Sequence, residues 1–252
     1  MSCEDDLRQT LANRDALEAN GNLLHWYRSL FDVQLGDARD LERKRVLEIG
    51  SGMSPIKRFH PSVMTSDVLR LDYLDHVFDC HAIDTFDGIP DRSLDMMIMT
   101  NVLHHLKAPV EFLLKARAKM KPGGTVVIVE PYFSTVSRFI YKYLHYEPTD
   151  FSVGAPELDE RAGPLSAANQ ALPYLVFFSD RGWDRPLRAA YEFDVREAGY
   201  FTGLSYFLTG GIHHRFPIAL RIYRGLHAFD LWLSRLFPRL YASFFILRLK
   251  AR

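Results

Sequence analysis

Hydrophobic and polar positions follow a helical period over the first 40 residues. Apolar side chains recur at intervals that place them on one face, and Asn13, Gly21 and Asn22 offer breaks between turns. These apolar positions are Leu11, Leu17, Leu23, Leu24, Trp26, Tyr27, Leu30 and Phe31. The pattern predicts an N-terminal helical cap over 1–42. It favours helices that cover a sheet edge over helices that cap a pocket.

From Arg45 onward, short apolar runs alternate with stretches of helical length. The runs that we predict to be strands are 45–49, 62–65, 75–78, 94–99, 124–129 and 193–198. A helix is predicted over 106–120, and the Lys-Pro-Gly-Gly sequence at 121–124 ends it. Strands that alternate with helices predict an α/β fold with a doubly wound, mostly parallel sheet.

The end of the chain contains one more apolar run. Residues 241–250 are short and bulky enough in composition to suit a buried strand better than a helix. We therefore predict a seventh strand within 241–252. The core then spans 43–198, and 199–240 forms a basic, aromatic helical insertion before the last strand.

Composition limits the class of protein. The 252 residues are 48% hydrophobic and 25% charged, which suits one globular unit with a full core. The two cysteines, Cys3 and Cys80, support neither a disulfide framework nor a thiolate metal site, and they favour a reducing compartment such as the cytoplasm. The acidic N-terminus does not resemble a secretory signal, no apolar run approaches the length of a membrane span, and no metal site is predicted.

The zero net charge hides an asymmetry. From Arg215 to Arg252 there are eight basic residues against Asp230 alone, a net charge of +7, and the rest of the chain carries −7. The tail is therefore electrostatically distinct from the core.

The strongest chemical signal is a predicted strand that runs into a glycine turn, Val46–Ser54. Glycine lets the backbone approach a ligand closely, and Glu48 directly before Gly50-Ser51-Gly52 makes the pattern more specific. Nineteen residues after Glu48, Asp67 ends the next strand, where a carboxylate would meet ribose hydroxyls. The alternative is that Asp67 only forms a turn.

With these residues in order, the chain resembles the class I methyltransferases that depend on S-adenosylmethionine (SAM). It is most similar to the branch with a Val-Leu-His-His-Leu segment after strand four. The resemblance covers 44–131 and rests on the following motifs: Leu47–Gly52, Asp67, Asp79-Cys80, Ser93–Asp95, Asn101–Leu106 and Lys121–Gly124. A nicotinamide enzyme with the same glycine turn is disfavoured by Pro55 and by the paired histidines.

The resemblance implies a seven-stranded Rossmann-like sheet with an antiparallel last strand and SAM as cofactor. Gly50 and Gly52, in one turn with Glu48 and Ser51, would face the methionine moiety. Asp67 would hold the ribose, Asp79 and Cys80 would lie by the adenine, and Asn101 would border the methyl-transfer chamber. Two departures are Ser54 in place of the family's third glycine and a longer 79–95 stretch, which leaves Asp84 as an alternative to Asp79.

Methyl transfer is an in-line displacement, for which a hydroxyl or amine acceptor needs positioning or a general base. The candidate catalytic residues are His104, His105 and Glu130; His145 and the His213-His214 pair are further candidate bases. A purely structural role is the alternative for each. The Asn/Asp-Pro-Pro-aromatic segment typical of adenine methylation in nucleic acid is absent after strand four, so no nucleic-acid partner is expected.

Two later segments concern the acceptor. The polar loop 147–185 suits the ligand-binding edge of the sheet and resembles, weakly, bacterial methyltransferases of surface-polysaccharide pathways. The predicted amphipathic helix 217–237 sets an apolar stripe beside Arg221, Arg224 and Arg235; the stripe contains Ile218, Ile222, Leu226, Phe229, Leu233 and Leu236, with Trp232 at the boundary. It fits adsorption to an anionic membrane, and the alternative is a helix that packs this stripe on the protein.

The sequence thus predicts a cytoplasmic methyltransferase, peripheral at the inner face of the membrane, that O-methylates a lipid-linked saccharide or another amphiphile. The alternatives are a soluble natural-product methyltransferase and a non-catalytic SAM-binding protein. The sequence does not indicate an oligomeric state.

Overall fold

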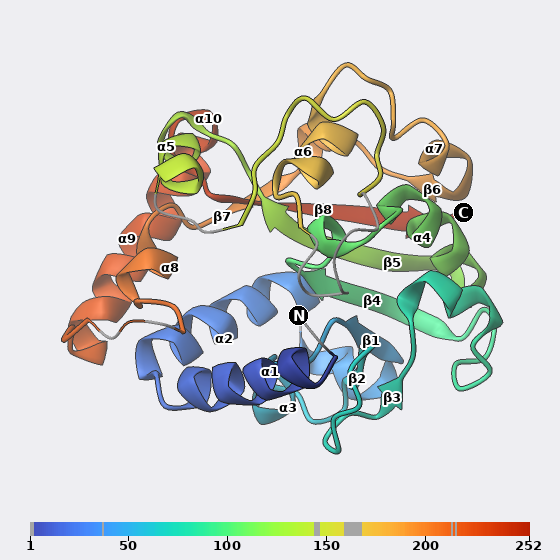
Figure 1. The fold of residues 1–252 in the computed structure, drawn as a ribbon, viewed down its shortest axis with the longest axis horizontal. Coiled ribbons are helices and arrows are strands. Elements are labelled where there is room, and N and C mark those ends of the chain that lie inside the picture. The colour runs from blue at the N-terminus through green and yellow to red at the C-terminus, as the bar shows by residue number, and fades with distance from the viewer. Residues whose placement is uncertain (1–2, 37, 144–146, 159–167, 213, 215) are drawn as a thin grey trace.

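A computed structural model of the protein describes residues 3–36, 38–143, 147–158, 168–212, 214 and 216–252. One mixed sheet runs through it (Figure 1). Its strands are β1 Val46–Ile49, β2 Met64–Asp67, β3 His76–Val77, β4 Leu94–Thr100, β5 Met120–Pro131, β6 Tyr191–Glu192, β7 Gly199–Phe201 and β8 Phe244–Ala251.

The strand order is β3-β2-β1-β4-β5-β8-β6, and β7 also pairs with β8. Strands β1 to β5 are parallel, whereas β8 runs antiparallel to β5 over the seven pairs from Thr125–Lys250 to Pro131–Phe244. The two short strands β6 and β7 pair with opposite ends of β8. The predicted Rossmann-like α/β fold with an antiparallel last strand is confirmed.

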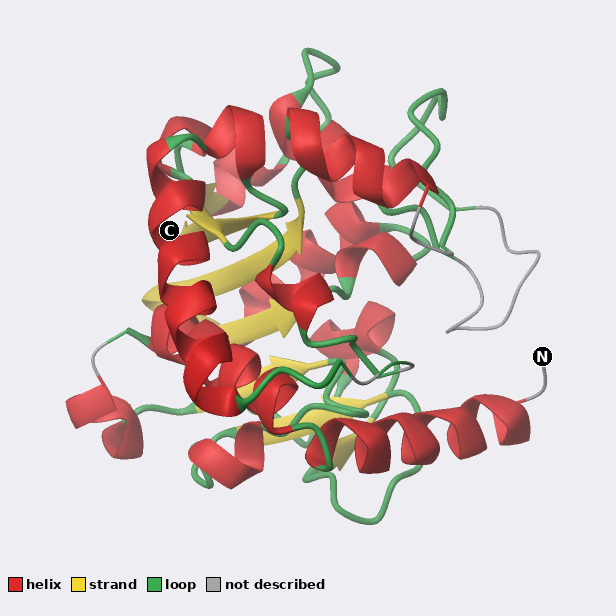
Figure 2. Ribbon diagram, turned by 90° about the vertical axis from the view of Figure 1, so that its left-hand side faces the viewer, coloured by secondary structure: helices red, strands yellow, loops and turns green. Residues whose placement is uncertain are grey.

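Helices cover both faces of the sheet (Figure 2). The α-helices are α1 Cys3–Glu18, α2 Gly21–Leu35, α3 Ile56–Phe59, α4 Pro109–Ala116, α5 Thr135–Tyr143, α6 Ala171–Phe178, α7 Leu187–Ala190, α8 Ser205–Leu208, α9 Leu220–Leu236 and α10 Pro238–Tyr241. Short 3-10 helices are η1 Ala38–Arg43, η2 Cys80–Thr85, η3 Leu103–His105, η4 Arg117–Lys119 and η5 Val195–Glu197.

Alternating side chains of the strands feed two separate cores. In β5, Val126 and Ile128 pack with α4 and α6, while Val127 and Val129 pack with the helices of the other face. Each central strand is therefore buried on both sides, as expected of a doubly wound sheet. This burial fixes where the carboxyl ends of the strands lie, and the predicted ligand residues follow those ends.

Three predicted elements differ from the structure. The predicted strand 193–198 is wrong: the chain leaves the sheet there in the 3-10 helix η5, because the side chain of Asp194 caps that helix by accepting from the Arg196 N–H. The second strand begins two residues later than predicted, at Met64. Residues 121–124, predicted as a turn, lie within β5 at an irregularity where the β4 pairing moves from Met120 to Thr125.

Candidate functional site

The glycine turn follows the carboxyl end of β1. Gly50 has φ +74°, and a Cβ built there would lie 2.6 Å from a methyl group of Val102. At Gly52 a Cβ would approach Asp67 Oδ2 and Thr10 Cγ2, each at 3.0 Å. Both positions therefore need glycine, because side chains from three other elements already press on this turn.

Glu48 is buried beneath that turn. Its Oε1 accepts a hydrogen bond from the Ser54 hydroxyl at 2.7 Å, and its Oε2 has no hydrogen-bond partner among the described residues. Burial raises the pKa of Glu48 to about 7, although the Ser54 hydrogen bond opposes the shift. Ser54 thus caps the carboxylate at the position where the family has its third glycine.

Asp67 ends β2 and faces the same turn. Its Oδ2 accepts from the Gly52 N–H at 2.9 Å and its Oδ1 from the Leu69 N–H at 3.0 Å. Burial raises the pKa of Asp67, while these backbone donors oppose the shift. The carboxylate is fixed in place, and its remaining lone pairs are available to hydroxyl groups.

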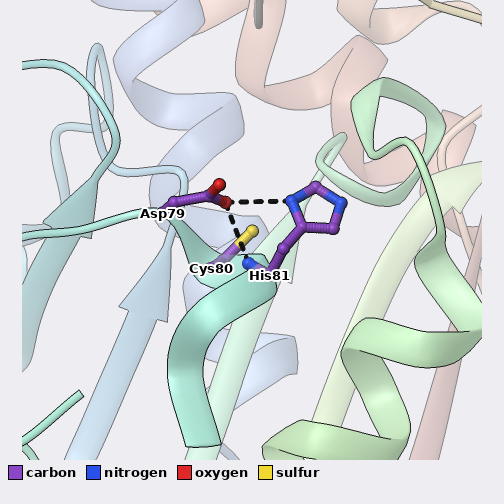
Figure 3. A group of neighbouring side chains, drawn as sticks. All are labelled: Asp79, Cys80 and His81. Atoms are coloured by element: carbon purple, nitrogen blue, oxygen red, sulfur yellow. Dashed lines mark hydrogen bonds and ion pairs between the residues drawn. The ribbon is translucent and has the colours of Figure 1, made fainter. Parts of the chain in front are cut away.

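Asp79, Cys80 and His81 follow β3 at the start of η2 (Figure 3). The Asp79 carboxylate accepts from the His81 N–H and contacts His81 Nδ1, both at 2.9 Å. Burial raises the pKa of the Cys80 thiol to about 12, so it remains a thiol at neutral pH. Asp84, the other candidate for the adenine position, lies further along the same helix.

Asn101 lies just beyond β4 with φ +55°, a left-handed conformation that asparagine tolerates. Its Oδ1 is buried without a partner among the described residues, as is Glu48 Oε2. Orphaned acceptors at the carboxyl edge of the sheet suit a ligand that brings positive charge and hydrogen-bond donors. SAM, with its ammonium and sulfonium groups, fits this set.

His104 and Glu130 form a fully buried pair. Glu130 Oε2 contacts His104 Nδ1 at 2.6 Å, and Glu130 Oε1 accepts from the N–H groups of Val102 and Leu103 at 2.8 and 2.6 Å. Glu130 thus ties β5 to the segment after β4. Burial lowers the pKa of His104, but Glu130 and Glu147 outweigh this and raise it to about 9.

Glu147 completes this cluster and was not predicted as a site residue. It lies 3.4 Å from His104 Nε2 and 3.9 Å from His105 Nε2, and it accepts from Gln170 Nε2 at 2.5 Å. Burial alone would raise its pKa, but the two histidines hold it well below its usual range. Its position at the start of the polar loop was the available signal. Of the other candidate bases, His145 and His213 lie outside the described residues.

Helix α1 brings a second unpredicted pair of residues to the site. Thr10 contacts the glycine turn, and Asp6 lies one helical turn before it on the same face. Asp6 is 1% exposed, and neither of its carboxylate oxygens has a hydrogen-bond partner among the described residues. No pattern in the sequence distinguishes Asp6 from the other acidic residues of this helix.

A glycine turn between a strand and a helix, with acidic side chains at successive strand ends, defines a Rossmann-like nucleotide-binding site. The chain belongs to the methyltransferase family: a family profile described as "Methyltransferase domain" matches residues 22–151, more than half of the chain. It is a class I methyltransferase whose cofactor is SAM. Comparison with curated protein sequences finds no match.

Solved structures share the fold at low sequence identity. A chain from the complex between the Haloferax volcanii Trm112 methyltransferase activator and a methyltransferase is 14% identical, with a TM-score of 0.51 over 99% of this chain and 97% of that chain. The N-methyltransferase NodS from Bradyrhizobium japonicum WM9, solved with S-adenosyl-L-homocysteine (SAH), is 12% identical, with a TM-score of 0.48 over 100% and 99%. A SAM-dependent methyltransferase from Archaeoglobus fulgidus is 14% identical, with a TM-score of 0.41 over 89% and 99%.

Bound SAM supplies an electrophilic methyl carbon, and the residues of this chain hold and orient the reactants. The glycine turn leaves room for a ligand backbone, and Asp67 presents a fixed acceptor. The His104–Glu130–Glu147 cluster lies after β4 and at the end of β5, on the side of the sheet where open α/β folds bind their ligands. This arrangement allows an acceptor to meet SAM over the carboxyl ends of the central strands.

Proposed function

We propose that this methyltransferase acts at an anionic membrane surface, on the cytoplasmic side, and O-methylates a lipid-linked saccharide or another amphiphilic acceptor. One observation carries the proposal: helix α9 turns its apolar stripe outward and its polar side chains inward. The proposed cofactor contacts are those of Glu48, Gly50, Ser51, Gly52, Asp67, Asp79, Cys80 and Asn101.

The exposed side of α9 is strongly apolar. Ile222, Phe229 and Trp232 are 57%, 60% and 56% exposed, and Leu226 and Leu236 are exposed as well. The inward side instead carries Tyr223, His227, Asp230 and Ser234, all of them buried. A surface helix of a protein that meets only water normally has the opposite orientation, so this helix suits an apolar environment.

The apolar surface extends beyond α9. Helices α5 and α10 pack together, and α10 also packs on α9, so the three gather at one end of the molecule (Figure 1). Phe139 and Tyr143 of α5 are each 60% exposed, and Leu240 of α10 is 54% exposed. We call the outward side chains of α5, α9 and α10 the apolar end surface. Its extent supports contact with a broad partner rather than a small ligand.

Basic side chains border this surface. Arg221, Arg224, Arg235 and Arg239 are exposed around the outward stripe, while Asp230, the acidic residue of this region, is buried. Arginines beside exposed aromatics match a headgroup region with anionic phosphates below which acyl chains begin. Among the described residues, no helix has an apolar stretch long enough to cross a bilayer.

A membrane-bound enzyme suits an acceptor that is itself anchored in the membrane. In our proposal the acceptor hydroxyl binds beside His104, His105 and Glu130, and its proton leaves through this cluster. Glu130 positions His104 through Nδ1, so that Nε2 is the ring atom available to the acceptor side.

Trp232 provides a direct test of membrane binding. Trp26 is buried and Trp183 half-buried, so Trp232 is the exposed tryptophan of the three in the chain. We expect its emission to shift to shorter wavelength with phosphatidylglycerol vesicles and much less with phosphatidylcholine vesicles. Replacing Leu226, Phe229 and Leu236 by serine should abolish the shift, because these side chains insert beside the reporter.

A matched control replaces Leu11, Val77 and Leu114 by serine, since these are also exposed apolar residues but lie away from the apolar end surface. This variant should bind vesicles as the wild type does. A wild-type protein that ignores anionic vesicles at low salt would favour a water-soluble acceptor. Mass spectrometry of lipid-linked glycans from cells with and without the protein then tests the acceptor class: a methyl group of 14 Da should disappear with the gene.

A further inference from the structure

The His104, His105 and Glu147 side chains converge from two segments of the chain. Their ligand-type atoms, the two imidazole nitrogens and a carboxylate oxygen, all lie within 4.8 Å of one another. The His104 Nε2–Glu147 distance is 3.4 Å and the His105 Nε2–Glu147 distance is 3.9 Å. A charge-assisted N–H···O hydrogen bond is shorter, about 2.7–2.9 Å.

The observed spacing is closer to that of ligands around one metal ion. In a tetrahedral site with bonds of about 2.0–2.1 Å, neighbouring ligand atoms are about 3.3 Å apart. An ion between the three side chains would need shifts of about an ångström or less at His105, which is half-buried and has room to adjust.

Glu130 acts on this group as carboxylates act on metal-bound histidines. Its contact with His104 Nδ1 at 2.6 Å leaves Nε2 to face Glu147 and His105. A carboxylate behind a histidine fixes the ring and raises its basicity toward a metal. Two backbone N–H groups, from Val102 and Leu103, hold Glu130 in turn, so the support is rigid.

The charges point the same way. Glu130 and Glu147 place two negative charges in a buried cluster, and one proton on His104 would balance one of them. A divalent cation bound to two neutral imidazoles would balance both. We propose that His104 Nε2, His105 Nε2 and Glu147 bind a divalent transition-metal ion, with Glu130 as the positioning residue behind His104. Two nitrogens and one oxygen suit zinc, cobalt, manganese or iron.

The inference deepens the proposed function, on which only its chemical purpose rests. An ion at this cluster would bind the acceptor hydroxyl through its oxygen and lower its pKa, so that the proton departs before or during methyl transfer. Metal binding itself does not depend on the identity of the acceptor or on the membrane.

A second group with metal-ligand atoms is Asp79, Cys80 and His81 (Figure 3). It is a poorer candidate because its thiol is protonated and its His81 ring is already held by Asp79 at 2.9 Å. His81 therefore serves as the control for ligand residues elsewhere in the chain.

The test is direct metal binding to the full-length protein after dialysis against EDTA. Titration with Co²⁺ should produce visible d–d absorption that saturates at one equivalent, and Zn²⁺ should displace it. His105→Ala and Glu147→Gln should weaken Co²⁺ binding at least tenfold. Glu130→Gln should weaken it about 10- to 100-fold, with circular dichroism confirming the fold. His81→Ala should leave it unchanged.

Saturation without visible absorption in the wild type, or loss of binding in His81→Ala, would overturn the proposal. So would equal Co²⁺ affinity in the wild type and in His105→Ala. Vesicle binding by Trp232 fluorescence is measured on the same variants. If the cluster binds metal but the protein ignores vesicles, the metal site stands and the membrane proposal fails.

Discussion

The hydroxyl of Tyr241 in α10 donates a hydrogen bond of 2.5 Å to Asp230 Oδ1 in α9. The same carboxylate accepts from the backbone N–H groups of Gly203, Leu204 and Ser205 at 2.9 to 3.1 Å. Four donors compensate the burial of this charge, and they all lie on the protein side of α9. Asp230 therefore fixes which side of the helix faces the protein, and the apolar stripe faces outward as a result.

We expect Asp230→Ala to lower the free energy of unfolding by about 3 kcal/mol, because it leaves three buried N–H groups and a buried hydroxyl without their acceptor. Tyr241→Phe should cost about 1 kcal/mol, since it removes one donor and leaves three. Urea unfolding followed by circular dichroism measures both. Equal midpoints for the wild type and Asp230→Ala would show that this network does not hold α9.

Replacing Arg221, Arg224 and Arg235 by glutamine should weaken binding to anionic vesicles, because each basic residue near a charged surface contributes about 1 kcal/mol. Raising the salt concentration should weaken wild-type binding in the same direction, since the Debye length shortens. SAM affinity should not change. The matched control replaces Arg43, Arg70 and Arg196, which are exposed elsewhere. A similar loss in both triple variants would argue against a specific basic rim.

The amphipathic pattern of 217–237 was sufficient to predict a helix and its stripe, but not the direction of the stripe. Which side faces the protein depends on Asp230, whose backbone partners at 203–205 lie more than 20 residues away and carry no sequence signal of their own. The same limit applies at the catalytic cluster: His104 and Glu130 follow predicted strands, whereas Glu147 reaches them from a loop.

The central strands were predictable because burial on both faces leaves continuous apolar runs, as in 94–99 and 124–129. The edge strands were not. β6 and β7 are two and three residues long, and a single predicted run at 193–198 fell between them, where Phe193 and Val195 pack on the core without joining the sheet. Side-chain burial and strand pairing part company at such an edge.

At the glycine turn, Gly50→Val should abolish SAM binding. The new side chain would meet Val102 and would require φ +74°, which β-branched residues avoid. Asp67→Ala should weaken binding by about tenfold or more, because two ribose hydroxyls would lose a charged acceptor. Isothermal titration with SAM and SAH measures both variants. Wild-type affinity in either variant would contradict the assigned site.

Glu48 predicts a pH dependence of SAM binding. Its pKa in the cofactor-free protein is raised to about 7, and the cationic groups of SAM favour the ionised carboxylate. We expect affinity to fall about tenfold per unit as the pH drops below 7, and to flatten as it approaches 8. Titrations between pH 5.5 and 7.5 test this. Glu48→Gln should bind more weakly at pH 7.5 but without the slope; an equally steep slope in that variant would assign the dependence to another group.

Removal of SAM should also show the other side of this linkage. Because the folded-state pKa of Glu48 lies above its unfolded value of 4.5, the cofactor-free protein binds the extra proton only when folded. Its stability contribution is therefore present below pH 4.5 and is lost as the pH rises toward 7. Saturating SAM should reduce this loss.

Asp6 is the residue whose role separates most clearly from the stability of the fold. Its buried carboxylate has no hydrogen-bond partner among the described residues, although its place in the first turn of α1 offers some compensation from the helix dipole. We expect Asp6→Asn to be at least as stable as the wild type toward urea, because a buried charge is removed. SAM affinity should fall about tenfold, because a cationic group of the cofactor loses its counter-charge. Comparison of SAM with SAH identifies that group: an equal fall for both assigns the shared ammonium, and a fall for SAM alone assigns the sulfonium. A variant that loses stability and affinity together would show instead that Asp6 only supports α1.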